Sequence, residues 1–207
     1  MFFYWLQIVG TIFFAVSGAL SAYKKDFDVT SVMLIAFAVG NGGGTMRDVL
    51  IGATPVFWMQ QPMYIVLTML TGLIVFFVAE HFDVSSKAFL IADALELGVF
   101  AIAGAQKTLT FGLPPIVAIM MGVLSAVGGG IIRDVLSGDV PLILKPEIYA
   151  TAALAGATVF VILHVYVPGI KYIAGISCAL TVILIRLGTI KWGWQLPTPT
   201  WMKAKIR

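Results

Sequence analysis

The chain has 207 residues, of which 60% are hydrophobic and only 11% are charged, and its mean hydropathy is +1.01. A soluble domain carries about 25% charged residues, so this composition excludes an ordinary soluble domain. The net charge of +3 comes from basic residues scattered through short polar stretches, which is typical of membrane orientation signals rather than of a nucleic-acid surface.

Seven apolar segments follow one another, each about 20 residues long, the length needed to cross a hydrocarbon core of about 30 Å. They are expected at 2–22, 29–52, 63–79, 88–106, 115–138, 148–167 and 169–188. Strands are not expected, because an open sheet edge in lipid leaves backbone groups unpaired. We therefore predict an all-α integral membrane protein with seven transmembrane helices in a single transmembrane domain.

An internal repeat divides this domain. Residues 42–52 read GGGTMRDVLIG and residues 128–138 read GGGIIRDVLSG, so eight of eleven positions match at an offset of 86. Phe14 and Phe100 keep the same offset. Because the offset spans three segments, an odd number, the second copy must enter the membrane from the opposite side. We expect repeat one at about 2–80, repeat two at about 88–167, a seventh helix at about 169–188 and a C-terminal tail at 191–207.

The distribution of Lys and Arg between loops predicts the orientation. With seven spans, one side of the membrane receives nine basic residues and the other receives two, leaving aside Arg47 and Arg133 inside apolar segments. The nine are Lys24, Lys25, Lys87, Lys145, Arg186, Lys191, Lys203, Lys205 and Arg207, and the two are Lys107 and Lys171. The positive-inside rule then places the N-terminus outside and the C-terminus in the cytoplasm. The tail also holds tryptophans beside basic residues, which suits an interfacial anchor or a disordered end.

Glycine triplets occur inside the second and fifth segments, at Gly42, Gly43 and Gly44 and again at Gly128, Gly129 and Gly130. Each glycine in a helix interior costs about 1 kcal/mol relative to alanine, so three in a row favour a kink or break. Broken backbone at membrane depth survives only where protein or water satisfies it, which predicts a polar cavity at these positions. The alternative is close helix packing, which small residues also allow.

Each triplet is followed by an arginine and an aspartate, Arg47-Asp48 and Arg133-Asp134. Charges inside a membrane segment are costly and point to a functional path. Neighbouring residues project about 100° apart on a helix, so each pair is expected to find partners on other helices. The alternative is that the arginines lie near helix ends and extend to the lipid headgroups.

Five further polar residues in the segments are candidate mouth or polar contacts: Ser17, Asn41, Asp93, Glu96 and Ser125. Asp93 and Glu96 are three residues apart and share a helix face, where they attract cations at a pore mouth or simply favour a helix N-terminus. No phosphate loop, catalytic triad or metal-ligand pattern accompanies them, so we expect no enzyme activity, no cofactor and no metal.

The duplicated GGGTMRD and GGGIIRD, in a seven-span chain of about 200 residues, resemble the prokaryotic trimeric intracellular cation (TRIC) channels. The resemblance implies a homotrimer with a pore inside each subunit, lined by kinked second and fifth helices, that passes potassium or sodium. It maps the two triplets, Arg47 and Arg133 to the pore-lining region. It also implies a prokaryotic plasma membrane, with monovalent cations and lipids as partners and no nucleic acid.

We therefore expect a monovalent cation channel, in which Arg47 and Arg133 shape the electrostatics at the two ends of the path. Related bacterial proteins of the same domain family are described as glycine transporters. The alternative is accordingly a secondary carrier for glycine or another small amino acid, and a third possibility is a membrane protein without conduction.

Overall fold

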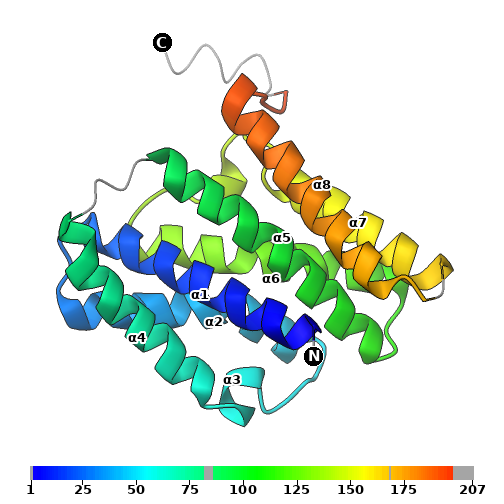
Figure 1. Ribbon diagram of the computed structural model, residues 1–207, viewed down its shortest axis with the longest axis horizontal. Coiled ribbons are helices and arrows are strands. Elements are labelled where there is room, and N and C mark those ends of the chain that lie inside the picture. Colours follow the sequence, from blue (N-terminus) through cyan, green and yellow to red (C-terminus); the bar gives the residue numbers. More distant parts are fainter. Residues whose placement is uncertain (1, 82–85, 168, 198–207) are drawn as a thin grey trace.

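The computed structural model describes residues 2–81, 86–167 and 169–197, and within these ranges the chain is helical (Figure 1). The only extended pairing among them is an isolated bridge between Glu147 and Gln195. The α-helices are α1 (Phe2–Tyr23), α2 (Val29–Leu50), α3 (Phe57–Gln60), α4 (Met63–Val78), α5 (Ser86–Thr110), α6 (Pro115–Leu136), α7 (Ala150–Tyr166) and α8 (Lys171–Trp192), with short 3-10 segments at Ala79–His81 and Leu142–Leu144.

Five of these helices are long and apolar enough to cross a membrane: Phe3–Tyr23, Val29–Leu50, Met63–His81, Pro115–Leu136 and Lys171–Trp192. Their bounds agree with five of the predicted segments. Helix α7 is shorter, with 17 residues, and α5 has 25 residues but contains Asp93, Glu96 and Lys107. The all-helical fold is thus confirmed, whereas the count of seven spans stays a prediction. The residues that dominate the predicted tail charge, Lys203, Lys205 and Arg207, lie outside the described part.

The two helices that contain the glycine triplets begin differently and end alike. Asp28 caps α2 by accepting a hydrogen bond from the Ser31 amide at 2.8 Å, whereas α6 begins with a proline at its first turn. Both are followed by a glycine with positive φ, Gly52 at 72° and Gly138 at 71°. Glycine adopts this conformation without the strain that a Cβ causes, so the repeat preserves the end of each helix.

Helices α1, α2, α5 and α6 form the centre of the molecule, since α1 packs on α2 and α5, and α6 packs on α2 and α5. Helix α4 covers α1 and α2 on one side, and the α7–α8 pair covers α5 and α6 on the other (Figure 1). Residues at equivalent positions of the repeat meet in this centre. The buried rings of Phe14 and Phe100 contact each other edge-on, with centroids 4.7 Å apart.

Candidate functional site

The glycine triplets lie inside uninterrupted helices, so the predicted helix break is wrong. The amide-to-carbonyl hydrogen bonds of α2 and α6 continue through both triplets, and a bend without a break remains a prediction. The reason for the glycines is close packing. A Cβ on Gly43 would collide with the carbonyl oxygen of Ser125 and would lie 3.2 Å from the Gly129 nitrogen. Helices α2 and α6 therefore approach backbone to backbone, as small residues allow.

The other glycines of the triplets also face protein atoms. A Cβ on Gly129 would press on the Phe14 ring at 2.6 Å, one on Gly44 would press on the Phe57 ring at 2.6 Å, and one on Gly130 would meet the Tyr149 hydroxyl at 2.6 Å. Gly42 also faces protein, because a Cβ there would collide with the Ile132 side chain, and it borders a mostly apolar pocket of about 340 Å³. Packing, rather than exposed backbone, explains most of the triplet positions.

The Arg-Asp pairs have the expected partners on other helices, since Arg133 contacts Asp93 and Asp48 contacts Lys107, but each arginine also binds its own neighbour. Nε of Arg47 donates to Oδ1 of Asp48 at 2.8 Å, and Nε of Arg133 donates to Oδ1 of Asp134 at 2.8 Å. The helix spacing that predicted otherwise ignores the long arginine stem, which folds back across the helix end. Both arginines are buried, at 0% and 1% exposure, so neither extends to the surface of the subunit.

The second oxygen of each aspartate fixes the chain after the helix. Oδ2 of Asp48 accepts from the backbone amide of Phe57 at 2.9 Å, and Oδ2 of Asp134 accepts from that of Leu142 at 2.9 Å. The aspartates therefore have the same structural role in both repeats, because each one links the arginine to the segment that follows the helix.

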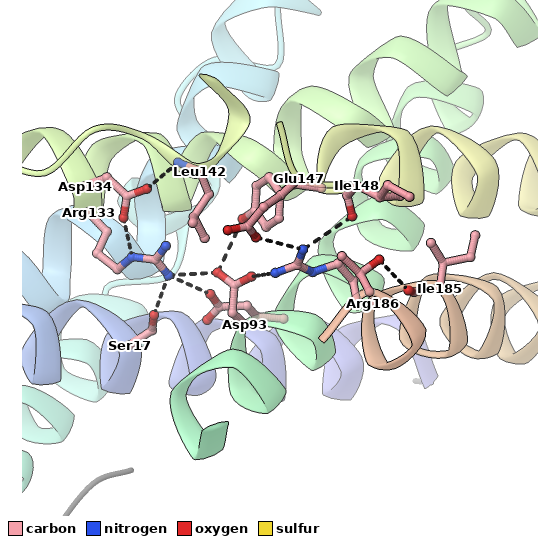
Figure 2. A network of polar contacts seen from close by, with 12 residues as sticks. Ser17, Asp93, Arg133, Asp134, Leu142, Glu147, Ile148, Ile185 and Arg186 are labelled. Carbon is pink, nitrogen blue, oxygen red and sulfur yellow. Dashed lines mark hydrogen bonds and ion pairs between the residues drawn. The ribbon is translucent and has the colours of Figure 1, made fainter. Parts of the chain in front are cut away.

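The surroundings of Arg133 are rich in acid. Its Nη1 lies 2.7 Å from the Ser17 hydroxyl, 2.9 Å from Oδ1 of Asp93 and 3.4 Å from Oε1 of Glu96, and Figure 2 shows Ser17, Asp93 and Asp134 arranged around the guanidinium. Asp93 and Glu96 are both 0% exposed. The interpretation of these two acids as ordinary helix N-terminal residues is therefore wrong, because they pair with a buried cation.

A second guanidinium, that of Arg186 on α8, reaches Asp93 from the other side (Figure 2). Nη2 of Arg186 lies 3.5 Å from Oδ2 of Asp93, and Nη1 lies 3.5 Å from Oε2 of Glu147. Arg186 also lies over the Tyr149 ring, 4.9 Å from its centroid. We call this group the acid-rich cluster, and its ionisable members are Asp93, Glu96, Arg133, Asp134, Glu147 and Arg186.

The surroundings of Arg47 are different. Among the described residues, one carboxylate, that of Asp48, lies in ion-pair contact, and it is shared between Nη2 of Arg47 at 2.7 Å and Nζ of Lys107 at 2.8 Å. The guanidinium carbon also lies 5.9 Å from the centre of the Phe57 ring. We call Arg47, Asp48 and Lys107 the basic cluster. Lys107, which is one-quarter exposed, borders a pocket of about 330 Å³ that includes Gln7 and Gln106.

The two clusters lie toward opposite ends of α5. Asp93 of the acid-rich cluster and Lys107 of the basic cluster are 14 residues apart on this helix, or about 21 Å at 1.5 Å per residue. The pair formed by Phe14 and Phe100 lies between them along the helix. The centre of the molecule therefore has a negatively charged end, an aromatic middle and a positively charged end.

The remaining predicted polar residues lie between the clusters. The Asn41 side-chain amide donates to the Phe37 carbonyl at 3.0 Å and to the Thr68 hydroxyl at 3.3 Å. Ser125 lies where α6 meets Gly104, and its buried hydroxyl has no hydrogen-bond partner among the described residues. Neither residue joins an ionic cluster.

Sequence reasoning missed Arg186, Lys107, Glu147 and Tyr149 as members of the clusters. Arg186 was counted among loop charges, yet it is 0% exposed within α8. Its position inside an apolar segment was the available signal. For Tyr149 the signal was its match to Tyr64 in the first repeat. No group of three or more His, Cys, Asp or Glu side chains that could hold a metal ion occurs in the part of the chain that the structure describes.

The chain is similar in sequence to a known family model and to bacterial membrane proteins. A family model described as "Glycine transporter" matches residues 4–80 and 90–165. The inner membrane protein YadS of Escherichia coli K12 is 38% identical over 199 residues, covering 96% of both chains. A membrane protein of Vibrio cholerae is also 38% identical, covering 94% of this chain and 82% of the relative.

Solved structures of TRIC cation channels have the same fold as this chain. The TRIC trimeric intracellular cation channel orthologue from Rhodobacter sphaeroides superposes with a TM-score of 0.89 at 38% identity, covering 93% of this chain and 98% of that one. A structure described as the basis for conductance through TRIC cation channels gives a TM-score of 0.86 at 35% identity, covering 97% and 98%.

Proposed function

Since the chain belongs to the family whose model is described as "Glycine transporter", and with it to the TRIC channel family, we propose that it is a monovalent cation channel with a path inside each subunit. The path would run through the centre formed by α1, α2, α5 and α6, from the acid-rich cluster to the basic cluster. Its ions would be potassium or sodium, and the structural neighbours described as cation channels support a cation as the permeant ion.

The observation that supports this proposal most strongly is the charge of the acid-rich cluster. Asp93, Glu96, Asp134 and Glu147 supply four carboxyl groups against the two guanidinium groups of Arg133 and Arg186, and the acids are still in excess when Glu96 carries a proton. Because buried charges are weakly screened, an excess of carboxylates raises the local concentration of cations. An end with this charge is suited to collecting cations and unsuited to collecting anions.

The aromatic middle explains how such a path would be closed. The Phe14 and Phe100 rings are both fully buried and in contact, and Phe14 also lies against Gly129. Hydrophobic constrictions gate channels by excluding water. In this proposal the rings part in the conducting state, and Arg47 and Arg133 act as electrostatic barriers on either side of them.

Planar-bilayer recording of the purified protein under a potassium chloride gradient tests the channel. We expect unitary currents whose reversal potential follows the potassium gradient. The double variant Phe14→Ala, Phe100→Ala should raise the open probability, whereas Phe77→Ala, on the exposed face of α4, serves as the control. A protein that reconstitutes normally yet passes no current under any voltage would contradict the proposal.

A carrier for glycine or another small amino acid is the second candidate, and the description of the family model favours it. A buried arginine beside carboxylates matches the two charges of an amino-acid zwitterion, since the guanidinium binds a carboxylate and the acids bind an ammonium group. Uptake of labelled glycine into proteoliposomes, saturable and free of unitary currents, would establish the carrier in place of the channel.

We also propose the finer architecture that the sequence predicts. The chain would cross a prokaryotic inner membrane seven times, as two inverted repeats followed by α8, with the N-terminus outside and the C-terminus in the cytoplasm, and would form a homotrimer. The relation to an inner membrane protein and to trimeric channels supports this arrangement.

Labelling of single cysteines tests the topology. The native Cys178 is buried and is first replaced by alanine. A cysteine at Lys24 or Lys191 should react with a membrane-impermeant maleimide only in inside-out vesicles, and one at Lys171 only in intact cells after access through the outer membrane. Reaction of Lys171 and Lys191 variants from the same side would rule out a spanning α8.

A further inference from the structure

Arg186 is held differently from the other buried arginine of the acid-rich cluster. The nitrogens of Arg133 make contacts of 2.7–2.9 Å with Ser17, Asp93 and Asp134. Arg186 makes only contacts of 3.3–3.5 Å, to Asp93, Glu147 and the Ile148 carbonyl. Well-formed N–H···O hydrogen bonds measure 2.7–3.2 Å, so Arg133 is fixed by directional bonds and Arg186 is held mainly by charge.

The oxygens around Arg186 form a set that suits a cation without directional demands. Oδ2 of Asp93, Oε2 of Glu147 and the Ile148 carbonyl oxygen converge on one guanidinium, as Figure 2 shows. Two carboxylates and a carbonyl are hard oxygen ligands, and the Tyr149 ring beneath them offers its electron-rich face. Nε of Arg186 has no hydrogen-bond partner among the described residues.

An oxygen atom of the cluster also lacks a hydrogen-bond partner. Oε2 of Glu96 is buried, in a residue with 0% exposure, and accepts no hydrogen bond within the described structure. Because a buried carboxyl oxygen without a hydrogen-bond partner is costly, this atom is an open acceptor for a further donor or cation.

The site is reachable from the molecular surface. A pocket of about 180 Å³, lined in part by Glu147, Thr189 and Gly193, opens beside it. The Glu147 side chain is 34% exposed. The segment after α8 holds this rim in place, because the Leu196 amide donates to the Pro146 carbonyl at 3.0 Å. A cation arriving at Glu147 would therefore meet Asp93 behind it.

We propose that Asp93, Glu147 and the Ile148 carbonyl form a binding site for a monovalent cation, and that Arg186 is a tethered cation which occupies this site in the structure. Free potassium or sodium competes with the guanidinium for the same oxygens. The proposal deepens the cation path proposed above, since the site lies at its acid-rich end. Helix α8 has no counterpart in the repeat, and Arg186 lies beyond the stretches that the family model matches. The first repeat therefore supplies no equivalent of Arg186 to the basic cluster.

Thermal unfolding of the purified protein tests the site without any need for conduction. The variant Arg186→Gln is measured in potassium chloride, sodium chloride and choline chloride at equal ionic strength, because choline is too large for the site. We expect the Tm to be about 3–5 °C higher in the alkali salts, which corresponds to an ion concentration near ten times the Kd. The wild-type protein should show a difference of less than about 1 °C, since its own guanidinium fills the site.

Two controls sharpen the outcome. The double variant Glu147→Gln, Arg186→Gln should lose the alkali-ion stabilisation, because one of the two carboxylates of the site is gone. Arg47→Gln, which removes a buried guanidinium from the basic cluster, should gain none. If Arg186→Gln does not fold, Arg186→Lys replaces it. The shorter, compact ammonium group keeps the charge but leaves part of the oxygen set free, so a smaller alkali-ion dependence is expected.

Equal Tm values in potassium, sodium and choline chloride for every folded Arg186 variant would overturn the proposal, and so would an equal alkali-ion effect in Arg47→Gln. The result is separate from the proposed function. Ion-dependent stability in a protein that passes no current would support the cation site and contradict the channel. Currents without ion-dependent stability would support the channel and contradict the cation site.

Discussion

The basic and acid-rich clusters begin from the same three residues, Arg-Asp-Val, at matched positions of the repeat, yet they reach opposite charge. Asp48 neutralises one of two cations at the end of α2, whereas four carboxylates surround two arginines at the end of α6. The difference comes from the partner helices. Positions 93 and 96 of the second repeat are acids, where the first repeat has Gln7 and Gly10. Both repeats thus keep the same Arg-Asp arrangement. Residues on the neighbouring helix determine whether the cluster around it is acidic or basic.

The comparison predicts that the two arginines differ most in their contribution to stability. Arg133→Ala leaves Asp93, Glu96 and Asp134 buried with less counter-charge, which should cost about 3–5 kcal/mol. Arg47→Ala leaves Asp48 still paired with Lys107, so we expect about 1–3 kcal/mol. Thermal unfolding of both variants in detergent measures the difference. Arg133→Lys is the control for charge alone, and equal losses for the two alanine variants would remove the distinction between the clusters.

The glycines of the two triplets should also respond unequally. A methyl group on Gly43 meets the Ser125 carbonyl, which is backbone and cannot move aside, whereas one on Gly129 meets the Phe14 ring, which can rotate. Gly43→Ala should therefore cost about 1–3 kcal/mol, as overpacked sites do, and Gly129→Ala less.

The matched control is Gly98→Ala on α5, where an added methyl group has ordinary contacts of 3.4–3.6 Å. This variant should be neutral or slightly stabilising, because alanine favours the helix. Stability of Gly43→Ala equal to that of Gly98→Ala would contradict the backbone contact between α2 and α6. In current recordings, Gly129→Ala should change gating, since it displaces the Phe14 ring.

A smaller effect is expected on conduction when charge is removed from each mouth. Lys107→Gln lowers the positive charge at the basic end, so cation current at low salt should rise about two-fold and the gain should vanish near 1 M salt. Lys25→Gln, whose amine pairs with Asp139 at the surface, is the control and should change the current little. A fall in current in Lys107→Gln would mean that the basic end does not oppose cations.

The smallest effect concerns stability at the surface of the acid-rich end. Lys25 and Asp139 form an ion pair of 2.7 Å with side chains that are 37% and 48% exposed. Exposed pairs contribute about 0–1 kcal/mol because water and salt screen them. Lys25→Ala should therefore lower the stability by less than about 0.5 kcal/mol, in contrast to the buried arginines, and thermal unfolding at two salt concentrations checks both the size and the screening.

Hydropathy was sufficient to place the main helices, because membrane-length apolar runs have little structural ambiguity. Segment 115–138 became α6 (Pro115–Leu136), and segment 63–79 became α4 (Met63–Val78). The short α3 (Phe57–Gln60) was not predicted, since four residues between two spans leave no periodic pattern.

The candidate site was only partly predictable, because ion pairs across helices depend on packing that no local pattern encodes. The repeat singled out Arg47 and Arg133, and both side chains are buried. It could not indicate that Glu96 faces Arg133, nor that Arg186 approaches from α8, a helix without a counterpart. The triplets were misjudged as breaks because helix propensity is a local quantity, whereas the contact of Gly43 with α6 is a tertiary one.

The contact between Phe14 and Phe100 has a consequence for how the chain is assembled. In a two-fold symmetric dimer, a residue on the symmetry axis touches its own copy in the other subunit. Here a residue touches its repeat equivalent inside a single polypeptide, and Gly43 does the same with Gly129. The centre of the molecule thus has the form of a subunit interface enclosed within one chain. Two separately expressed halves, divided between α4 and α5, are therefore expected to find each other and to re-form the complete bundle.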